Sequence, residues 1–503
     1  MAEDGGLRRA AGQALLMIRG RILQELQYTR GSGQESRGGI KNVEQYVGGE
    51  EKEKLHGDAI CCEEIMENKT LGANKTTSSK LADVKCSEKG VSTAEKLARV
   101  EERVLPGGVE VGVVGRWASE TLARLLQVVA SSSVAASPGS SPPADDHILA
   151  NALLDYSWQK LNTGHWKDVD LSWRWVFTWG SLALVGLLLL RLQVASGAHS
   201  ASHTSAYLAA ADVVRACDRG LLMGAPVDDN PLHSTAAALN TYARLARAGA
   251  AEDEGEDGAS ITQQDAASVT SPLPSVHCPP LDRFLLHYMT AGVPVKLLGV
   301  VDHWPALNLW NIPYLRQIAG ARIVPVEVGA RYTDLTWSQA LMTLDDYLTT
   351  YVTHHTPSTP IGYLAQHQLL DQVPQLQDDI LVPDYCHLGE DPPRLHAWLG
   401  PRGTVSPLHH DPDHNILVQV MGYKYIRLYG EEQSGLVYPH ADPLLANTSQ
   451  ADVEGPLEEW PLLQRAQYHD LVLGPGEALY IPPRCWHYVR SLSTSFSVSF
   501  WWT

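Results

Sequence analysis

The chain has 503 residues, of which 44% are hydrophobic, so it can form two or three domains with buried cores. A formal net charge of -18 argues against nucleic acid as a direct ligand and favours basic protein partners. The seven cysteines form neither a disulfide framework nor a Cys-x-x-Cys zinc pattern, so a reducing intracellular compartment is expected. The acidic start, Met-Ala-Glu-Asp, lacks an uninterrupted apolar run and predicts no signal peptide.

The first half of the chain is predicted to be helical after a disordered start. Residues 1–105 contain a Gly-rich run and a Lys/Glu-rich stretch, and are expected to be mostly disordered. An α-helical domain is predicted over residues 106–248, with a Ser/Pro-rich insert at 131–141 and helices at 146–161, 171–194, 205–223 and 230–248. Residues 249–275 include Glu252-Asp-Glu-Gly-Glu-Asp257 and are predicted to form an acidic flexible linker.

One apolar run, residues 176–190, resembles part of a membrane span. A span needs about 20 residues, and this run approaches that length only by crossing Arg191. Because it lies within a series of predicted helices, we expect a buried helix and no membrane contact.

Residues 276–503 are predicted to form a β-rich catalytic domain. Alternating apolar residues indicate strands at 295–301, 322–328, 415–420 and 495–501. The runs 415–421 and 424–429 flank Gly422-Tyr423, a pattern typical of a β-hairpin. Further on, a tight turn at 474–477 precedes a short strand at 478–481, which Pro482-Pro483 ends.

A candidate metal site lies in this domain. His-x-Asp followed at a distance by a second histidine is a recurrent ligand set for ferrous iron, since it leaves positions open for a co-substrate and dioxygen. The chain has three such triplets, beginning at His56, His409 and His440, and only His409 leads into a strand pattern. Residues i and i+2 of a strand share a face, so His409 and Asp411 can bind one ion while His410 points away. His487, 76 residues after Asp411, can supply the third ligand from a neighbouring strand.

Lys424 lies 15 residues after His409 and offers a cation for the distal carboxylate of 2-oxoglutarate. Ser406, Asn415 and Tyr363 are available as polar partners. The alternatives are an ordinary strand-edge lysine for Lys424 and a hydrogen-bonded core histidine for His487.

These elements resemble the JmjC-domain 2-oxoglutarate oxygenases of the asparaginyl-hydroxylase-like branch. The resemblance is strong over about residues 276–503 and weaker at 153–166 and 217–224. It is carried by Ser406-Pro-Leu-His-His-Asp411, the predicted hairpin with Lys424, Gly474-Pro-Gly-Glu477 with Trp486-His487, Val301-Asp-His-Trp-Pro305, and the segments 324–334, 362–368 and 495–503. It implies an α+β chain: a C-terminal JmjC or cupin double-stranded β-helix with an N-terminal α-helical domain.

The resemblance also implies roles for individual residues. It makes His409, Asp411 and His487 the Fe(II) ligands and catalytic centre. It assigns contacts with 2-oxoglutarate to Tyr363, Ser406, Asn415, Lys424 and Trp501, and contacts with the substrate to Glu327, Tyr332, Trp337 and Trp398. Core packing is the alternative for the three aromatic residues of the last group. His410 departs from the family pattern, with little expected effect because it should face away from iron.

The implied activity is Fe(II)-, 2-oxoglutarate- and O2-dependent hydroxylation of proteins. Glu327 can pair with a guanidinium, which favours arginyl C-hydroxylation of basic proteins or peptides. Demethylation of methyl-lysine, as on the histone H3 tail, is the second candidate, and a non-catalytic cupin scaffold is the third. The expected location is the nucleus, as for a chromatin regulator, with the cytoplasm as a second compartment.

Overall fold

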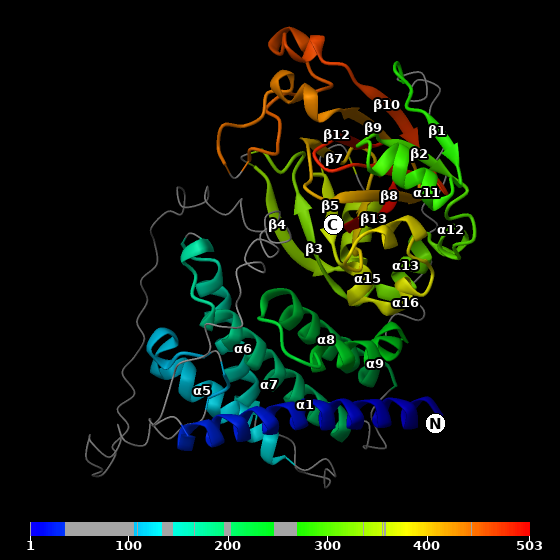
Figure 1. Ribbon diagram of the computed structural model, residues 1–503. Helices are drawn as coiled ribbons and strands as arrows, with labels where there is room; N and C mark the ends of the chain where they lie inside the picture. Colours follow the sequence, from blue (N-terminus) through cyan, green and yellow to red (C-terminus); the bar gives the residue numbers. More distant parts are fainter. Residues whose placement is uncertain are drawn as a thin grey trace, which may run out of the picture. The chain divides into compact units, whose positions relative to one another are not determined.

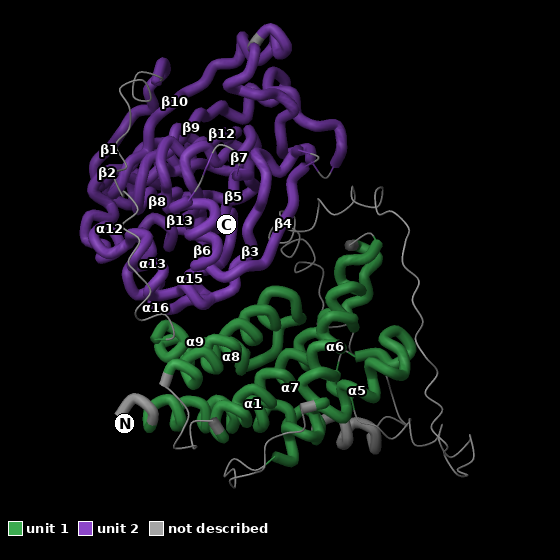
Figure 2. The backbone as a smooth tube through the Cα atoms, turned by 180° about the vertical axis from the view of Figure 1, so that it is seen from behind, with its two compact units in different colours: residues 1–246 green, residues 247–503 purple. Residues whose placement is uncertain are grey.

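The computed structural model describes residues 2–35, 105–107, 109–132, 144–164, 166–195, 203–245, 269–334, 336–354, 356, 359–443 and 445–503. The chain divides into two units, residues 1–246 and 247–503 (Figure 2). The predicted insert at 131–141 and the acidic run at 252–257 fall largely or wholly outside the described residues.

The first unit is helical, as predicted. Its helices in chain order are α1 (Ala2–Glu35), α5 (Val111–Ser131), α6 (Ala144–Leu161), α7 (Ser172–Ala195), α8 (His203–Met223) and α9 (Pro231–Leu245), with a short turn of 3-10 helix at Trp166–Asp168 (Figure 1). Four of these lie within a few residues of the helices that apolar periodicity predicts.

Helix α1 lies within residues 1–105, which are expected to be mostly disordered, and over Ala2–Glu35 the structure differs from that expectation. Leu7, Ala11, Leu15, Ile18 and Ile22 recur at intervals of three or four residues and are fully buried. This spacing makes one apolar stripe, which packs against α7 and α9. The Lys/Glu-rich composition further along obscured this stripe; residues 36–104 lie outside the described part.

Helix α7 contains the apolar run that resembles a membrane span. Residues Ser172–Val194 are long and apolar enough to cross a membrane, but 83% of an 18-residue stretch within them is buried inside the structure. Helices α1, α5, α6 and α8 all contact α7. The run is therefore the core helix of the first unit, as predicted.

The second unit contains two β-sheets. The larger has the strand order β1-β2-β11-β8-β13-β6-β5-β3-β4 and the smaller β10-β9-β12-β7. The strands are β1 (Ser275–His277), β2 (Val295–Leu298), β3 (Ile323–Val328), β4 (Ser338–Thr343), β5 (Gly362–His367), β6 (Arg394–Gly400), β7 (Val405–His409), β8 (His414–Met421), β9 (Lys424–Tyr429), β10 (His469–Leu473), β11 (Ala478–Ile481), β12 (Trp486–Ser491) and β13 (Ser495–Trp502).

The predicted hairpin of β8 and β9 is wrong in its pairing. Both strands form with nearly the predicted bounds, but β8 pairs with β11 and β13 while β9 pairs with β10 and β12. The chain passes from one sheet to the other at Gly422, where φ is +73° and an added Cβ would lie 1.9 Å from the Thr494 carbonyl oxygen. A glycine turn signal thus marks the end of a strand without specifying that strand's partner.

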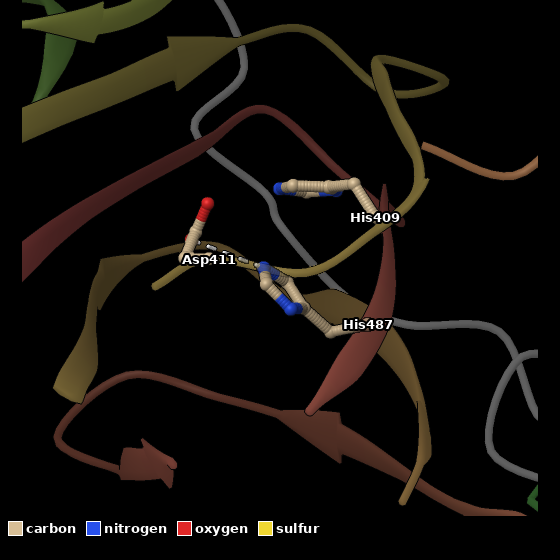
Figure 3. A group of neighbouring side chains, drawn as sticks. All are labelled: His409, Asp411 and His487. Carbon is tan, nitrogen blue, oxygen red and sulfur yellow. Dashed lines mark ion pairs between the residues drawn. The ribbon is translucent and has the colours of Figure 1, made fainter. Parts of the chain in front are cut away.

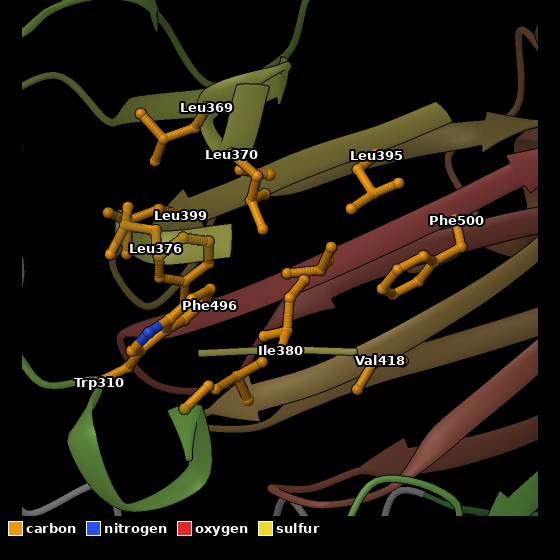
Figure 4. Close-up of a cluster of buried hydrophobic side chains, with 14 of the residues drawn as sticks. Trp310, Leu369, Leu370, Leu376, Ile380, Leu395, Leu399, Val418, Phe496 and Phe500 are labelled. Carbon is orange, nitrogen blue, oxygen red and sulfur yellow. The ribbon is translucent and has the colours of Figure 1, made fainter. Parts of the chain in front are cut away.

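The large sheet is covered on one face by short helices. These are α11 (Leu281–Phe284), α12 (Ala306–Leu309), α13 (Ile312–Ala319), α14 (Leu344–Tyr347), α15 (Leu369–Gln372) and α16 (Pro374–Gln377), with π or 3-10 turns at Leu285–Met289, Leu348–Thr353 and Asp384–Leu388. Three further 3-10 turns, Glu431–Leu436, Leu457–Glu459 and Leu463–Arg465, lie between β9 and β10, where Leu436 and Leu463 share an apolar core with Tyr425 and Tyr429 of the small sheet. Residues from α15 and α16 share a buried core with Phe496 and Phe500 of β13 (Figure 4). Ile312 and Leu315 of α13 belong to the same core.

The other face of the large sheet meets the small sheet. Because side chains alternate along a strand, Phe496, Val498 and Phe500 point into the helix-covered core, while Ser499 and Trp501 face the space between the sheets. A second apolar core fills part of that space, with Leu417 and Leu479 from the large sheet and Ile426 and Leu428 from the small one. The remainder is a cavity.

The start of the second unit also differs from the prediction, which placed a linker up to residue 275. The carboxylate of the fully buried Asp470 accepts hydrogen bonds from the backbone amides of Thr270 (3.1 Å) and Ser271 (2.7 Å). The segment before β1 is therefore bound to β10, and the described part of the predicted linker belongs to the β-rich unit.

Candidate metal and co-substrate site

The three predicted metal ligands meet between β7 and β12. His409 ends β7, His487 lies directly opposite it on β12, and Asp411 follows in the next turn. One ligand atom from each lies within 4.8 Å of the others (Figure 3). Asp411 lies beyond the end of the strand, where its backbone carbonyl accepts a hydrogen bond from the Arg484 amide at 2.8 Å.

Both histidines are oriented by the backbone. The Nδ1 of His409 lies 2.7 Å from the carbonyl oxygen of Pro407, and the Nδ1 of His487 lies 3.0 Å from that of Cys485. With Nδ1–H donating to these carbonyls, Nε2 carries the lone pair in each ring. Carbonyl partners of this kind commonly fix the tautomer of metal-binding histidines.

The charge state of the cluster also suits a cation. Burial, with His409 alongside, lowers the pKa of His487 to about 4, so its imidazole is neutral at neutral pH. The 3.7 Å between His487 Nε2 and Asp411 Oδ2, drawn in Figure 3, is therefore an approach of two electron-pair donors rather than a true ion pair. Asp411 Oδ2 is buried and has no hydrogen-bond partner within the described part of the chain. These donors fit a divalent metal ion, which would satisfy all three.

A cavity adjoins this cluster and is lined by strands of both sheets. The predicted co-substrate residues Tyr363, Ser406, Asn415, Lys424 and Trp501 all line it together with the three metal-binding candidates. The lining also includes Trp398, Leu417, Ile481, Val489 and Ser499. Leu417, Ile481, Val489 and Ser499 are not among the predicted residues, although Leu417, Val489 and Ser499 each lie two residues from a predicted lining residue on the same strand and so share its face.

Lys424 is the cation of this cavity. Its side chain is 1% exposed, and Nζ donates a hydrogen bond to the Tyr363 hydroxyl at 3.2 Å. Ser406 lines the same cavity as Tyr363. Among the described residues no carboxylate forms an ion pair with Lys424. Asn415 Oδ1 and Trp501 Nε1 are buried in the same cavity without a hydrogen-bond partner among those residues. The cavity thus holds a buried amine and unused polar atoms, which fit a small dicarboxylate such as 2-oxoglutarate.

The pKa of Lys424 predicts a pH dependence of co-substrate binding. Burial lowers this pKa to about 7, so Lys424 in the free site is protonated below pH 7 and largely neutral above it. A bound carboxylate favours the ammonium form and raises the pKa again. Binding of 2-oxoglutarate at pH 8 should therefore take up nearly one proton, and its affinity should fall as the pH rises above 7.

Isothermal calorimetry of the metal-loaded protein without oxygen measures this uptake. At pH 8 the binding enthalpy should change with the ionisation enthalpy of the buffer, and at pH 6 it should change much less. Equal enthalpies in all buffers at pH 8 would show that Lys424 is already charged in the free site.

The four predicted substrate residues do not all line this cavity. Trp398 lines the cavity itself, and its Nε1 donates to Ser499 Oγ at 2.8 Å. Glu327 pairs with Tyr363 across β3 and β5, and its carboxylate accepts a hydrogen bond from Trp337 Nε1 at 3.2 Å. Tyr332 lies within 3.2 Å of the Thr448 hydroxyl. Thr448 forms an isolated β-bridge with His409, which connects Tyr332 to the metal-binding strand.

Comparison with known proteins agrees with this geometry. Residues 281–503 match the cupin-like domain family. Lysine-specific demethylase 8 of Danio rerio is 46% identical over 365 residues, which cover 70% of this chain and 87% of that protein. The chain belongs to the JmjC family of cupin-fold Fe(II)/2-oxoglutarate oxygenases.

Two further JmjC relatives align over similar lengths. Lysine-specific demethylase 8 of Xenopus tropicalis is 39% identical over 408 residues, covering 71% of this chain and 88% of that protein. Jumonji C domain-containing protein 5 of Drosophila melanogaster is 35% identical over 409 residues, covering 80% of this chain and 95% of that protein. The family and the α+β fold class predicted from sequence motifs are confirmed.

Proposed function

We propose that this JmjC protein hydroxylates arginine side chains of basic proteins. The observation that carries the proposal is Glu327. Its carboxylate is half-buried next to the cavity, burial raises its pKa to about 7, and no cationic side chain in the described part of the chain pairs with it. A guanidinium would stabilise the ionised form with two parallel hydrogen bonds.

The residues of the cavity take the roles that the family implies. His409, Asp411 and His487 would hold Fe(II), and Lys424 with Tyr363, Ser406, Asn415 and Trp501 would hold 2-oxoglutarate. When bound, these groups supply oxidative decarboxylation to succinate and insertion of one oxygen atom of O2 into a C–H bond. The backbone carbonyls of Pro407 and Cys485 keep both imidazoles turned toward the metal. The apolar Leu417, Ile481 and Val489 limit the water around the co-substrate.

The substrate side chain would enter past Glu327 and Trp337. The indole Nε1–H of Trp337 holds the carboxylate in place, and Trp337 itself is 6% exposed. Tyr332 and Trp398 supply aromatic surface on which a planar guanidinium can stack. A net charge of -18 favours encounter with basic peptides in the nucleus or the cytoplasm.

Methyl-lysine demethylation, with histone tails as a substrate class, is the second candidate. It is favoured by the names of the Danio rerio and Xenopus tropicalis relatives, both lysine-specific demethylases. The aromatic residues Tyr332, Trp337 and Trp398 also suit a methylammonium. A non-catalytic scaffold is a weaker candidate, since a protein without this chemistry needs neither three converging metal ligands nor a buried, unpaired lysine.

Glu327→Gln separates the two catalytic candidates. The change keeps size and shape but removes the charge, so oxidation of an arginine peptide should lose about 2 to 4 kcal/mol of transition-state stabilisation. Oxidation of a dimethyl-lysine peptide should change little. Rates for both peptides are measured with both enzymes by mass spectrometry, at fixed iron. An unchanged arginine rate, or an equal loss for both peptides, contradicts the assignment of Glu327.

A further inference from the structure

The segment 447–452 contacts both the metal-binding strand and the segment that carries Tyr332. It lies between β9 and β10, far in sequence from each of its partners. Its contacts with β7 are made by the backbone. Thr448 and His409 form an isolated antiparallel β-bridge, and the Ser449 amide donates a hydrogen bond to the Leu408 carbonyl at 2.8 Å. The amide of His410 donates to the Asn447 carbonyl at 2.9 Å. These bonds join the segment to the turn between His409 and Asp411.

The contacts of segment 447–452 on its other side are made by side chains. Asp452 forms an ion pair with Arg331, with 2.6 Å between Oδ2 and Nη2. The hydroxyl of Thr448 lies 3.2 Å from that of Tyr332. Both partners belong to residues 329–334, which begin directly after β3 and two residues after Glu327. Trp337 is attached to the same segment, because its amide donates to the Asp334 carbonyl at 3.0 Å.

We propose that Arg331 and Asp452 are positioning residues, whose ion pair holds residues 329–334 at a fixed distance from the metal-binding strand. This inference rests on the proposed function, because it gives the pair the task of placing Glu327, Tyr332 and Trp337 against the substrate. Neither Arg331 nor Asp452 touches the reacting atoms. They act through Tyr332 and Trp337, so their loss should affect the peptide and leave iron and 2-oxoglutarate unaffected.

A second ion pair in the same unit, between Lys296 and Glu477, provides a matched control. Lys296 Nζ and Glu477 Oε1 also lie 2.6 Å apart, and their side chains are 18% and 28% exposed, against 34% and 31% for Arg331 and Asp452. The Lys296 pair joins β2 to the turn before β11. Glu477→Gln therefore removes a comparable ion pair without touching segment 447–452.

The first arm of the test measures hydrogen exchange in the full-length protein, without substrate. Asp452→Asn should make the amides of residues 329–334 exchange about two- to five-fold faster, the factor that corresponds to loss of one partly exposed ion pair. Arg331→Gln should do the same, and the double variant should add little more. Glu477→Gln should leave residues 329–334 unchanged. Equal exchange in Asp452→Asn and the parent overturns the proposal.

The second arm measures turnover with an arginine peptide. Asp452→Asn should raise KM for the peptide about two- to five-fold and lower the ratio of hydroxylated peptide to succinate. The affinity for 2-oxoglutarate, and succinate formation without peptide, should stay as in the parent. Arg331→Lys keeps the positive charge, so it should raise the peptide KM less than Arg331→Gln does. Faster exchange with an unchanged peptide KM overturns the positioning role.

The two arms also separate this inference from the proposed function. If the parent enzyme leaves arginine peptides unmodified, the proposed function fails. The exchange arm then still tests whether the ion pair holds residues 329–334, because that arm needs no substrate.

Discussion

Replacing His487 by alanine should abolish iron binding at working concentrations, and His409→Ala should do the same. Each imidazole supplies one of three protein ligands, and loss of even an outer hydrogen-bond partner of a metal ligand costs about 10- to 100-fold in affinity. We expect a loss of at least about 100-fold for either variant, together with loss of succinate formation. Equilibrium dialysis followed by metal analysis measures the first effect.

His410→Ala is the matched control for the metal site. His410 is adjacent to both His409 and Asp411, but its ring packs at 4.6 Å on Trp486, on the side away from the cluster. This variant should keep iron, with only a modest loss of stability. If His410→Ala loses iron while His487→Ala retains it, the ligand set is wrong.

Lys424→Met should almost eliminate 2-oxoglutarate binding and leave the protein at least as stable as the parent. The methionine fills the same space but removes the cation, so the co-substrate carboxylate would be buried without its partner, a loss of about 2 to 5 kcal/mol. In the free protein the amine itself is buried, and its hydrogen-bond partner among the described residues is the Tyr363 hydroxyl. Its removal therefore relieves a desolvation cost.

Calorimetry of 2-oxoglutarate binding and thermal unfolding of the free protein test the two halves of this prediction. Lys296→Met is the control, because Lys296 is only partly buried and pairs with Glu477. That variant should lose a little stability and keep its affinity for 2-oxoglutarate. If the Lys424→Met protein unfolds at a much lower temperature than the parent yet binds 2-oxoglutarate with the same affinity, Lys424 is a structural residue.

Much of the fold could be predicted because its signals are local. The alternation of Phe496, Val498 and Phe500 with serines determines a strand wherever it lies in the molecule. The same rule places Asn415 and Trp501 on the faces that line the cavity. The sheet to which each strand belongs is not a local property, which is why the turn at Gly422 was misassigned as a hairpin.

The remaining features depend on contacts between distant parts of the chain. Arg331 and Asp452 are 121 residues apart, and neither lies in a recognisable motif. Thr270 and Ser271 have a linker-like sequence, yet they bind the carboxylate of Asp470 about 200 residues later. Helix α1 is a different case: its apolar spacing was present in the sequence, and composition averaged over a longer stretch concealed it.

The most direct test of the proposed function follows the fate of molecular oxygen. The full-length protein is incubated with Fe(II), 2-oxoglutarate, heavy-isotope dioxygen and two peptides, one containing arginine and one containing dimethyl-lysine. Mass spectrometry should find one heavy oxygen atom on an arginine carbon and the other in succinate, in a ratio near one to one. Formaldehyde from the dimethyl-lysine peptide, with the arginine peptide unmodified, would contradict arginyl hydroxylation and make this chain a demethylase.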